Sequence, residues 1–286
     1  MAANRPTNEQ IIAALNKSGF LFEQEVATAL EEEGFHVETS WPYLDLDTKK
    51  SREIDLRAVK TFLHDEERKI QVFAELLVEC KDSSCPFVFL ERPKNKRELV
   101  TLRPKEYIFP CRFYRENIGP NSFREVPAFS HLGLASSHYY FQSPNKATQF
   151  SKVVRKGSDW VANHDGIYDS IFLPMVKALD MRLKSLGLNN SGDWRVVWLV
   201  FPVVVLRDNL MSLTLDGEEK TLMERGRITF VRNLDSDILK GDYLVDFVTS
   251  HYLRSYLESD VGSFATAVAN LSVSSPALIR GDKVLK

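Results

Sequence analysis

The chain has 286 residues, of which 44% are hydrophobic, 11% aromatic and 27% charged, with a formal net charge of −2 at pH 7. A chain of this length and composition is an ordinary globular protein that can bury a full core in one large domain or two small ones. The near-neutral charge neither favours nor excludes nucleic acid, because a protein that binds it needs a basic track only where the phosphate backbone lies.

Cysteine usage and hydropathy indicate a compartment. The three cysteines, Cys80, Cys85 and Cys111, form no C-x-x-C pair and show no zinc-site spacing. No charged-then-apolar leader opens the chain, and the longest apolar run, residues 196–206, is too short to span a bilayer. We therefore expect a cytoplasmic protein in a reducing environment, with no membrane partner.

Two helices are predicted at the start of the chain. Thr7 and Gln10 form a capping box before an apolar run, which predicts a short first helix. Residues 19–35 then read as an amphipathic helix closed by glycine, and its apolar stripe consists of Phe22, Val26, Ala29 and Leu30.

The acids of this second helix differ in the direction they face. On a helical wheel Glu23 lies only about 20° from Leu30, whereas Glu25 lies about 140° away. We expect Glu23 to flank the buried face, and Glu25, Glu31 and Glu32 to point outward.

Residues 36–41 predict a first strand, and residues 51–81 predict a β-hairpin whose arms are separated by the polar turn 64–69. If the hairpin folds about that turn, residues whose numbers sum to roughly 133 face one another, which places Asp55 almost opposite Glu79. Lys81 shares a face with Glu79, and Cys80 points to the opposite face, because strand side chains alternate with period two.

Two carboxylates and an ammonium on one patch of a sheet are what a hydrolase requires to act on phosphodiesters through a divalent metal. Glu-x-Lys occurs three times, at residues 67–69, 79–81 and 218–220, and only Glu79 ends an apolar run. A carboxylate and a lysine there are costly to desolvate unless they pair with each other or with a metal. The alternative is a simple ion pair at the end of the sheet.

The order of a helix glutamate, a strand aspartate and a strand Glu-x-Lys resembles the PD-(D/E)xK nuclease superfamily, and the pattern around Phe22, Val26, Leu30 and Gly34 is similar to its Mrr-type and Holliday-junction-resolvase-like members. The resemblance covers roughly residues 15 to 90, with Ile54 in place of the proline of the name. It implies a restriction-endonuclease-like α/β/α sandwich with a central mixed sheet.

The same resemblance implies roles for four side chains. Asp55 and Glu79 would be ligands of Mg²⁺, for which Mn²⁺ could substitute, and Lys81 would orient the attacking water. Glu23 would be an auxiliary acid near the metal.

Residues from about 86 to 145 lack a clear period and read as an insertion or wrapping arm within a single domain, residues 1–286. Inside it, residues 91–115 are rich in cations, among them Lys94, Lys96 and Arg97, as in surfaces that bind phosphates and stack bases. The interleaved aromatic residues are Tyr107, Phe109, Phe113 and Tyr114. The alternative is a solvated arm with its aromatic side chains in the core.

The second half of the chain completes an α/β pattern. Residues 146–188 read as helical, with interruptions near Gly157 and Gly166, and their first turns carry Lys152 and Arg155 as further candidates for DNA contact. Residues 194–215 predict a central strand, a break at Pro202 and a further strand, residues 227–231 another strand, and residues 244–271 a closing helix or helix pair.

These patterns predict an α/β sandwich whose activity is metal-dependent hydrolysis of DNA phosphodiester bonds, in host defence, restriction or repair. DNA is the expected partner, and a homodimer is left open. Two alternatives remain: a non-catalytic nucleic-acid-binding or scaffolding protein on the same fold, and a nuclease that cleaves RNA.

Overall fold

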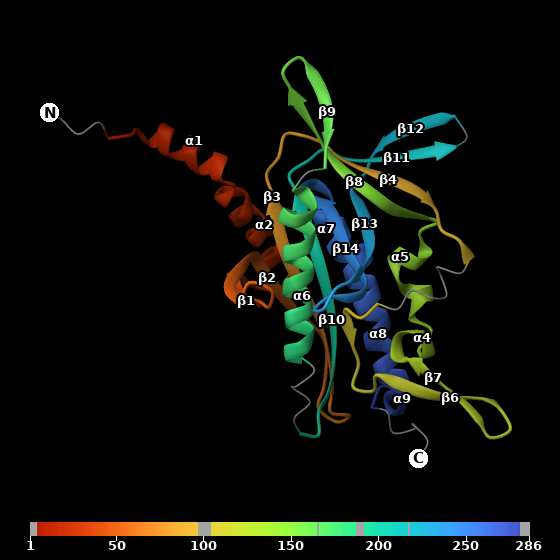
Figure 1. Cartoon of the computed structure of the whole chain (residues 1–286). Helices are drawn as coiled ribbons and strands as arrows, with labels where there is room; N and C mark the ends of the chain where they lie inside the picture. The colour runs from red at the N-terminus through yellow and green to blue at the C-terminus, as the bar shows by residue number, and fades with distance from the viewer. Residues whose placement is uncertain (1–4, 97–103, 165, 187–191, 217, 281–286) are drawn as a thin grey trace.

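The computed structural model describes residues 5–96, 104–164, 166–186, 192–216 and 218–280. Its centre is a mixed sheet of twelve strands, of which ten follow the order β1-β2-β3-β10-β14-β13-β8-β4-β11-β12, while β5 pairs with β10 and β9 with β8 (Figure 1). The strands of this sheet are β1 (His36–Asp45), β2 (Lys50–Asp65), β3 (Ile70–Lys81), β4 (Phe87–Pro93), β5 (Tyr107–Ile108), β8 (Asn145–Lys156), β9 (Asp159–Asn163), β10 (Arg195–Leu206), β11 (Leu210–Asp216), β12 (Glu219–Glu224), β13 (Arg227–Asp235) and β14 (Lys240–Thr249). A separate two-stranded sheet joins β6 (Phe113–Gly119) and β7 (Ser122–Pro127).

The helices are short or of moderate length. They are α1 (Asn8–Ser18), α2 (Phe20–Glu32), α4 (Ala128–His131), α5 (Tyr139–Gln142), α6 (Leu173–Leu186), α7 (Leu253–Ser255), α8 (Ser263–Ser274) and α9 (Pro276–Arg280), with 3₁₀ turns at Leu134–Ser137 and Ser250–Tyr252 and π-helical turns at Tyr168–Phe172 and Tyr256–Gly262. Within the described ranges, no helix combines the length and the apolar character needed to cross a bilayer.

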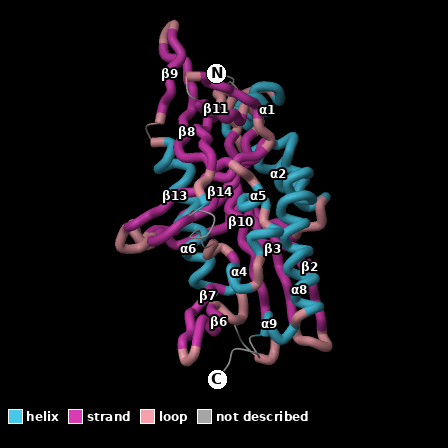
Figure 2. Tube along the Cα trace, turned by 90° about the vertical axis from the view of Figure 1, so that its right-hand side faces the viewer, coloured by secondary structure: helices cyan, strands magenta, loops and turns pink. Residues whose placement is uncertain are grey.

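Helices cover both faces of the sheet and define two cores. The α2/α8 core joins Phe22 and Leu30 of α2 to Val78 and Phe264, and the α6 core joins Leu77 to Phe172 and other residues on the opposite face. Figure 2 shows α6 on one side of β3 and β10, and α2 with α8 on the other. The predicted mixed α/β class with a large central mixed sheet is confirmed.

The predicted N-terminal helices are confirmed. Thr7 and Gln10 form the capping box of α1. In α2 the side chains of Phe22, Val26 and Leu30 are buried as predicted, and Ala27 is buried beside them. Gly34, with a φ of 80°, follows the helix in the left-handed conformation that glycine adopts at little cost.

The helical prediction for residues 146–188 is wrong in its first part. Residues Asn145–Lys156 and Asp159–Asn163 form the hairpin β8–β9, and helix is found only in the π-helical turn and α6 further on. Val153, Val154 and Val161 are β-branched, and Gly157 has a φ of 67° at a two-residue turn. These are local features of a hairpin, and they outweigh the helical spacing of the apolar residues.

Two further boundaries differ from expectation. The strand β10 runs through Pro202 without a break. On the side of β10 away from β3, no backbone partner among the described residues faces Pro202: Val200 donates its N–H to the Glu106 carbonyl, and pairing with β14 begins at Val203. A proline is tolerated where no ladder N–H is needed. Residues 244–249, predicted as helix, belong to β14 because parallel pairing with β10 overrides their local preference.

The segment predicted as an insertion, about residues 86–145, is partly built into the main sheet. β4 pairs with β8 and β11, and β5 pairs with β10. The β6–β7 hairpin and α4 form a separate lobe, whose Tyr114 donates its hydroxyl hydrogen to the Leu278 carbonyl in α9.

A buried ion network ties β2 and α6 to β3. The Glu75 carboxylate, fully buried, lies 2.6 Å from Arg57 Nε and 2.7 Å from Arg182 Nε. Arg57 also reaches Glu38, whose side chain is 43% exposed. The guanidinium groups of Arg57 and Arg182 are therefore both held against the sheet by the Glu75 carboxylate, which has no access to water.

We predict that Glu75→Gln lowers the free energy of unfolding by about 3 to 5 kcal/mol, because it leaves two mostly buried guanidinium groups without their shared counter-charge. Glu38→Gln is the matched control and should cost at most about 1 kcal/mol, since its ion pair is half exposed. Urea denaturation at neutral pH measures both. Equal costs for the two variants would contradict the role given to Glu75.

Candidate active site

Asp55 and Glu79 occupy adjacent strands just beyond the last pair of the β2–β3 ladder. Leu56 pairs with Val78, so Asp55 and Glu79 are the next residues along the two strands. This register is within one residue of the predicted one.

An irregularity in β1 and β2 makes room for Asp55. Thr39 pairs with Leu56 and Trp41 with Ile54, but no pair is formed between Ser40 and Asp55, and Ser40 has a φ of 50°. In a regular strand Leu56 and Ile54 would face the same side. Instead, Leu56 packs in the α2/α8 core and Ile54 in the α6 core. The two strands therefore change faces at this point, which leaves Asp55 between the cores.

Two short contacts connect the predicted residues. Asp55 Oδ2 accepts a hydrogen bond of 2.6 Å from the Cys80 backbone N–H, and Lys81 Nζ lies 2.5 Å from Glu79 Oε1. Cys80 packs in the α2/α8 core, so Glu79 and Lys81, its neighbours in the strand, face the α6 side as predicted.

The three acids are coupled electrostatically. Burial raises the pKa of Glu79, and the charges of Asp55 and Glu23 raise it further, against the opposing effect of Lys81. Burial likewise raises the pKa of Asp55, although the Cys80 N–H and Lys81 act the other way. For Glu23, burial is again the main cause of a raised pKa, and Asp55 adds to it. The structure thus brings Glu23 to the strand ends that carry Asp55 and Lys81.

Lys81 is held in its charged form. Burial alone would lower the pKa of this ammonium, but Glu79 and then Asp55 outweigh burial and raise it. The side chain is therefore a proton donor in hydrogen bonds and a fixed positive charge.

Glu23 and Glu25 differ as the helical wheel predicts. Glu23 is half-buried, whereas Glu25 is exposed and lies 3.0 Å from Arg207 Nη1. Glu31 and Glu32 are exposed as well.

Sequence reasoning missed two residues at this end of the sheet. Arg207, which follows β10, lies over the Phe22 ring, with 4.4 Å from its guanidinium carbon to the ring centroid, and 2.9 Å from Asp82. It fastens the start of α2 to the end of β3. Its place directly after a long β-branched run is the signal that could have identified it.

Tyr43 is the second missed residue. Burial raises its pKa to about 12, with Arg52 acting the other way and the carboxylates of Asp45 and Glu79 adding to the rise. Its buried hydroxyl has no hydrogen-bond partner among the described residues. It thus leaves an O–H donor on the side of the sheet that bears Glu79.

The donor set fits a divalent cation with oxygen ligands. Three carboxylates share a single lysine here, which leaves excess negative charge in a half-buried place. Among the described residues, no group of three or more His, Cys, Asp and Glu side chains is arranged as a metal site. Mg²⁺ does not need one, because it commonly binds through one or two carboxylates together with substrate phosphates and waters.

The structure describes two of the three cations named in the predicted basic segment, Lys94 and Lys96. Lys94 Nζ donates to the Ser143 carbonyl at 2.6 Å and to the Tyr140 carbonyl, and lies 3.8 Å from the Tyr140 ring centroid. Its side chain therefore anchors α5, and its contact with phosphate stays a prediction. Lys96 is exposed, and Arg97 lies outside the described residues.

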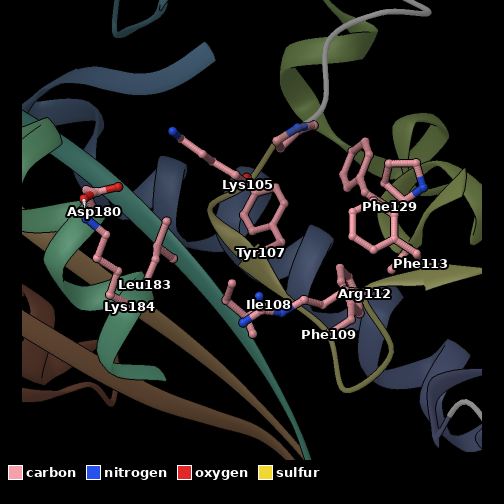
Figure 3. Close-up of a pocket in the computed structure, with 13 residues that line it drawn as sticks. Lys105, Tyr107, Ile108, Phe109, Arg112, Phe113, Phe129, Asp180, Leu183 and Lys184 are labelled. Atoms are coloured by element: carbon pink, nitrogen blue, oxygen red, sulfur yellow. Dashed lines mark ion pairs between the residues drawn. The ribbon is translucent and has the colours of Figure 1, made fainter. Parts of the chain in front are cut away.

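The aromatic residues of this segment follow the alternative interpretation. Tyr107, Phe109 and Tyr114 are 8%, 3% and 4% exposed, so their rings are not available for stacking on bases. Tyr107, Phe109 and the exposed Phe113 line a cavity of about 880 Å³ opposite Asp180 and Lys184 of α6 (Figure 3).

This cavity lies far from the acids. β5 pairs with β10 at Trp198 and Leu199, whereas Lys81 pairs with Leu206, about seven residues or roughly 23 Å further along the strand. The cavity is therefore separate from the candidate active site.

Lys152 and Arg155 lie on the β8–β9 hairpin. Lys152 is half-buried with its Nζ 5.7 Å from the Phe87 ring centroid, and Arg155 is exposed near the tip. Both remain available to a phosphate backbone, although from strands and not from the predicted helix.

Comparisons with known protein families, with curated proteins and with solved structures found no match to this chain.

We predict that Mg²⁺ stabilises the protein more at about pH 8 than at about pH 5. A carboxyl with a raised pKa binds its proton more tightly in the folded chain. Without metal, the free energy of unfolding should therefore fall as pH rises from the unfolded pKa, about 4, through the raised one. Mg²⁺ needs the ionised carboxylates and offsets this loss.

Thermal unfolding in chelator and in millimolar Mg²⁺ measures the effect. The variant Asp55→Asn/Glu79→Gln should lose it, and Glu25→Gln should keep it. A stabilisation by Mg²⁺ that is the same at both pH values would contradict metal binding by these acids.

Proposed function

We propose that this protein is a Mg²⁺-dependent nuclease of the PD-(D/E)xK kind, which hydrolyses DNA phosphodiester bonds. The observation that carries the proposal is the convergence of a helix acid, a strand acid and a strand Glu-x-Lys at one end of the sheet, where burial and mutual charge perturb all four groups. Perturbed groups that act on one another are typical of functional sites.

Each side chain has a part in this chemistry. Asp55 and Glu79 are the groups that would hold the metal, which when bound supplies an activated water and neutralises charge on the phosphate. Lys81, an ammonium beside Glu79, is placed to donate hydrogen bonds to the attacking water and to a non-bridging oxygen. Glu23 adds negative charge that strengthens cation binding, and the Tyr43 hydroxyl is a further donor.

A purely structural ion pair explains less of the arrangement. Glu79 and Lys81 would satisfy each other alone, yet Asp55 and Glu23 add two further carboxylates at a site where each raises the pKa of another. Such repulsion costs stability and calls for a cation. A non-catalytic scaffold on this fold would gain nothing from it.

The setting of the reaction is part of the proposal. Cys80, Cys85 and Cys111 are free thiols, which suits the cytoplasm. A homodimer would present two such sites to the two strands of a duplex, and sedimentation measures whether it forms. RNA as the polymer is tested by the same cleavage assay with RNA in place of DNA.

We predict that Asp55→Asn, Glu79→Gln and Lys81→Met each lower the rate of cleavage of supercoiled plasmid by about 100-fold or more, because each removes a group that acts on the reacting phosphate. The combined loss should be smaller than the product of the single losses, since the residues act as one unit. Lys220→Met, in an exposed Glu-x-Lys, is the matched control and should leave the rate unchanged. A variant of the first three that cleaves at the wild-type rate would refute the role of that residue.

A further prediction concerns the helix acids. Glu23→Gln should slow cleavage by about 10-fold or more, because one charge near the metal ligands is lost. Glu25→Gln should change the rate by less than about 2-fold, since its surface ion pair with Arg207 contributes little. Rates over a series of Mg²⁺ concentrations measure both, and equal losses would contradict the placement of Glu23.

A further inference from the structure

The outer part of the β8–β9 hairpin projects beyond the rest of the sheet. β4 pairs with β8 only as far as Phe87 opposite Lys152, and the hairpin continues past that pair to its turn at Gly157 and Ser158 (Figure 1). At about 3.3 Å per residue, the five residues beyond Lys152 extend roughly 17 Å.

This projecting ribbon combines a bare aromatic ring with positive charge. Trp160 is 65% exposed and sits directly opposite Arg155 in the ladder, so the two side chains share a face. Residues 152–163 carry three cations, Lys152, Arg155 and Lys156, against the single carboxylate of Asp159. In the described part of the chain, neither Arg155 nor Lys156 forms an ion pair.

The same face of the ribbon leads into a cavity at its root. Val153 and Ala162, the pair two positions below Arg155 and Trp160, line a cavity of about 630 Å³. Gln149, Phe150, Tyr168 and Arg232 also line it. Phe150 and Tyr168 in its wall pack with the α6 core, whereas Val88 and Leu90 line it from the opposite face of β4, so the cavity lies at the place where the hairpin leaves the sheet.

A short series of contacts joins the root of the hairpin to the proposed active site. The Arg207 N–H donates to the Lys81 carbonyl at 3.3 Å, and the Phe87 N–H donates to the Asn209 carbonyl at 2.9 Å. Lys152 then lies over the Phe87 ring. These contacts form a continuous path from Lys81 to the root of the hairpin.

The Trp160 ring and the cavity suit a nucleic-acid base whose face is not covered by a neighbouring base. An aromatic side chain flanked by cations is how proteins bind unpaired nucleic acid, because every base has a face to stack and every nucleotide a phosphate. In an intact duplex those faces are covered, and opening a step costs a few kcal/mol. Where a duplex adjoins single-stranded DNA, the bases of the single strand are already unpaired, so no opening free energy is needed.

We propose, on the basis of the nuclease function above, that the β8–β9 hairpin binds the unpaired bases of DNA in which duplex adjoins single strand. Trp160 stacks on the first unpaired base, and the cavity beneath Val153 and Ala162 receives the next nucleotide. Arg155, on the same face as Trp160, contacts the phosphate between them, and Lys152 and Lys156 on the opposite face add positive charge to the ribbon. The substrate of the site is thus branched or tailed DNA in preference to closed duplex.

The test measures binding by fluorescence anisotropy in chelator, so that it does not depend on cleavage. The probes are a duplex with a single-stranded tail, a duplex closed at both ends by hairpins, and the tail strand alone. Trp160→Ala should weaken binding of the tailed duplex and of the single strand by about 5- to 150-fold, the loss of one stacked base, and change the closed duplex by less than about 2-fold. Trp160→Phe should retain most of the affinity.

Phe123→Ala is the matched control. Phe123 is a 54% exposed aromatic residue on the β6–β7 hairpin, and its removal should leave all three affinities unchanged. Arg155→Ala should instead weaken all probes and reduce the salt dependence of binding by roughly one phosphate contact. Unfolding midpoints of the Trp160 and Phe123 variants should match the wild type, since both rings are exposed.

Three outcomes would overturn the proposal: equal losses on all three DNAs with Trp160→Ala, unchanged binding of the tailed duplex, or a wild-type protein that binds RNA but not these DNAs. The proposed catalysis fails separately. A wild-type protein that binds tailed DNA through Trp160 but shows no cleavage dependent on Asp55 would retain the hairpin's role and refute the nuclease.

Discussion

The change of face of β1 and β2 at Ser40 and Asp55 is the constraint on which the site depends. Strand side chains alternate between faces, so a regular β2 would direct Asp55 to one face and bind its backbone on both sides. The irregularity removes that pairing and frees the carboxylate to accept the Cys80 N–H at 2.6 Å. The acid is thereby fixed at the edge between the two cores, where Glu23 from one face and Glu79 with Lys81 from the other reach the same place.

Glu75 and Glu79 lie on the same face of β3 but differ in how far their charge is neutralised. Glu75 is fully buried but neutralised by Arg57 and Arg182, so it serves as a rigid joint between β2, β3 and α6. Glu79, four residues further on, has one lysine, whose charge also acts on Asp55 and Glu23. A satisfied network holds the strands in place, and the network at their ends carries the excess of carboxylates on which the proposed metal binding rests.

The sequence predicted best what depends on neighbours along the chain. The stripe of α2 and the outward direction of Glu25 follow from periodicity, and the structure confirms them. The register of the β2–β3 hairpin follows from the position of its turn and is within one residue of the predicted one at Asp55 and Glu79. The sequence failed where distant pairing decides. Residues 244–249 are strand because β10 lies beside them. Ser40 gave no signal either, because nothing in its neighbourhood marks a residue with positive φ.

The β8–β9 hairpin is attached to the part of the sheet that carries the candidate active site by side-chain packing more than by backbone pairing. The strands that carry the hairpin join the remainder of the sheet through one backbone pair, Phe230 with Ala147. Around that narrow joint, Phe89 and Phe150 stack with centroids 5.0 Å apart, and Phe89 lies 4.8 Å from Phe247. Aromatic packing of this kind is directional, so it fixes an angle as well as a distance. The angle at which the β8–β9 hairpin leaves the sheet therefore depends on a cluster of aromatic rings in the α6 core.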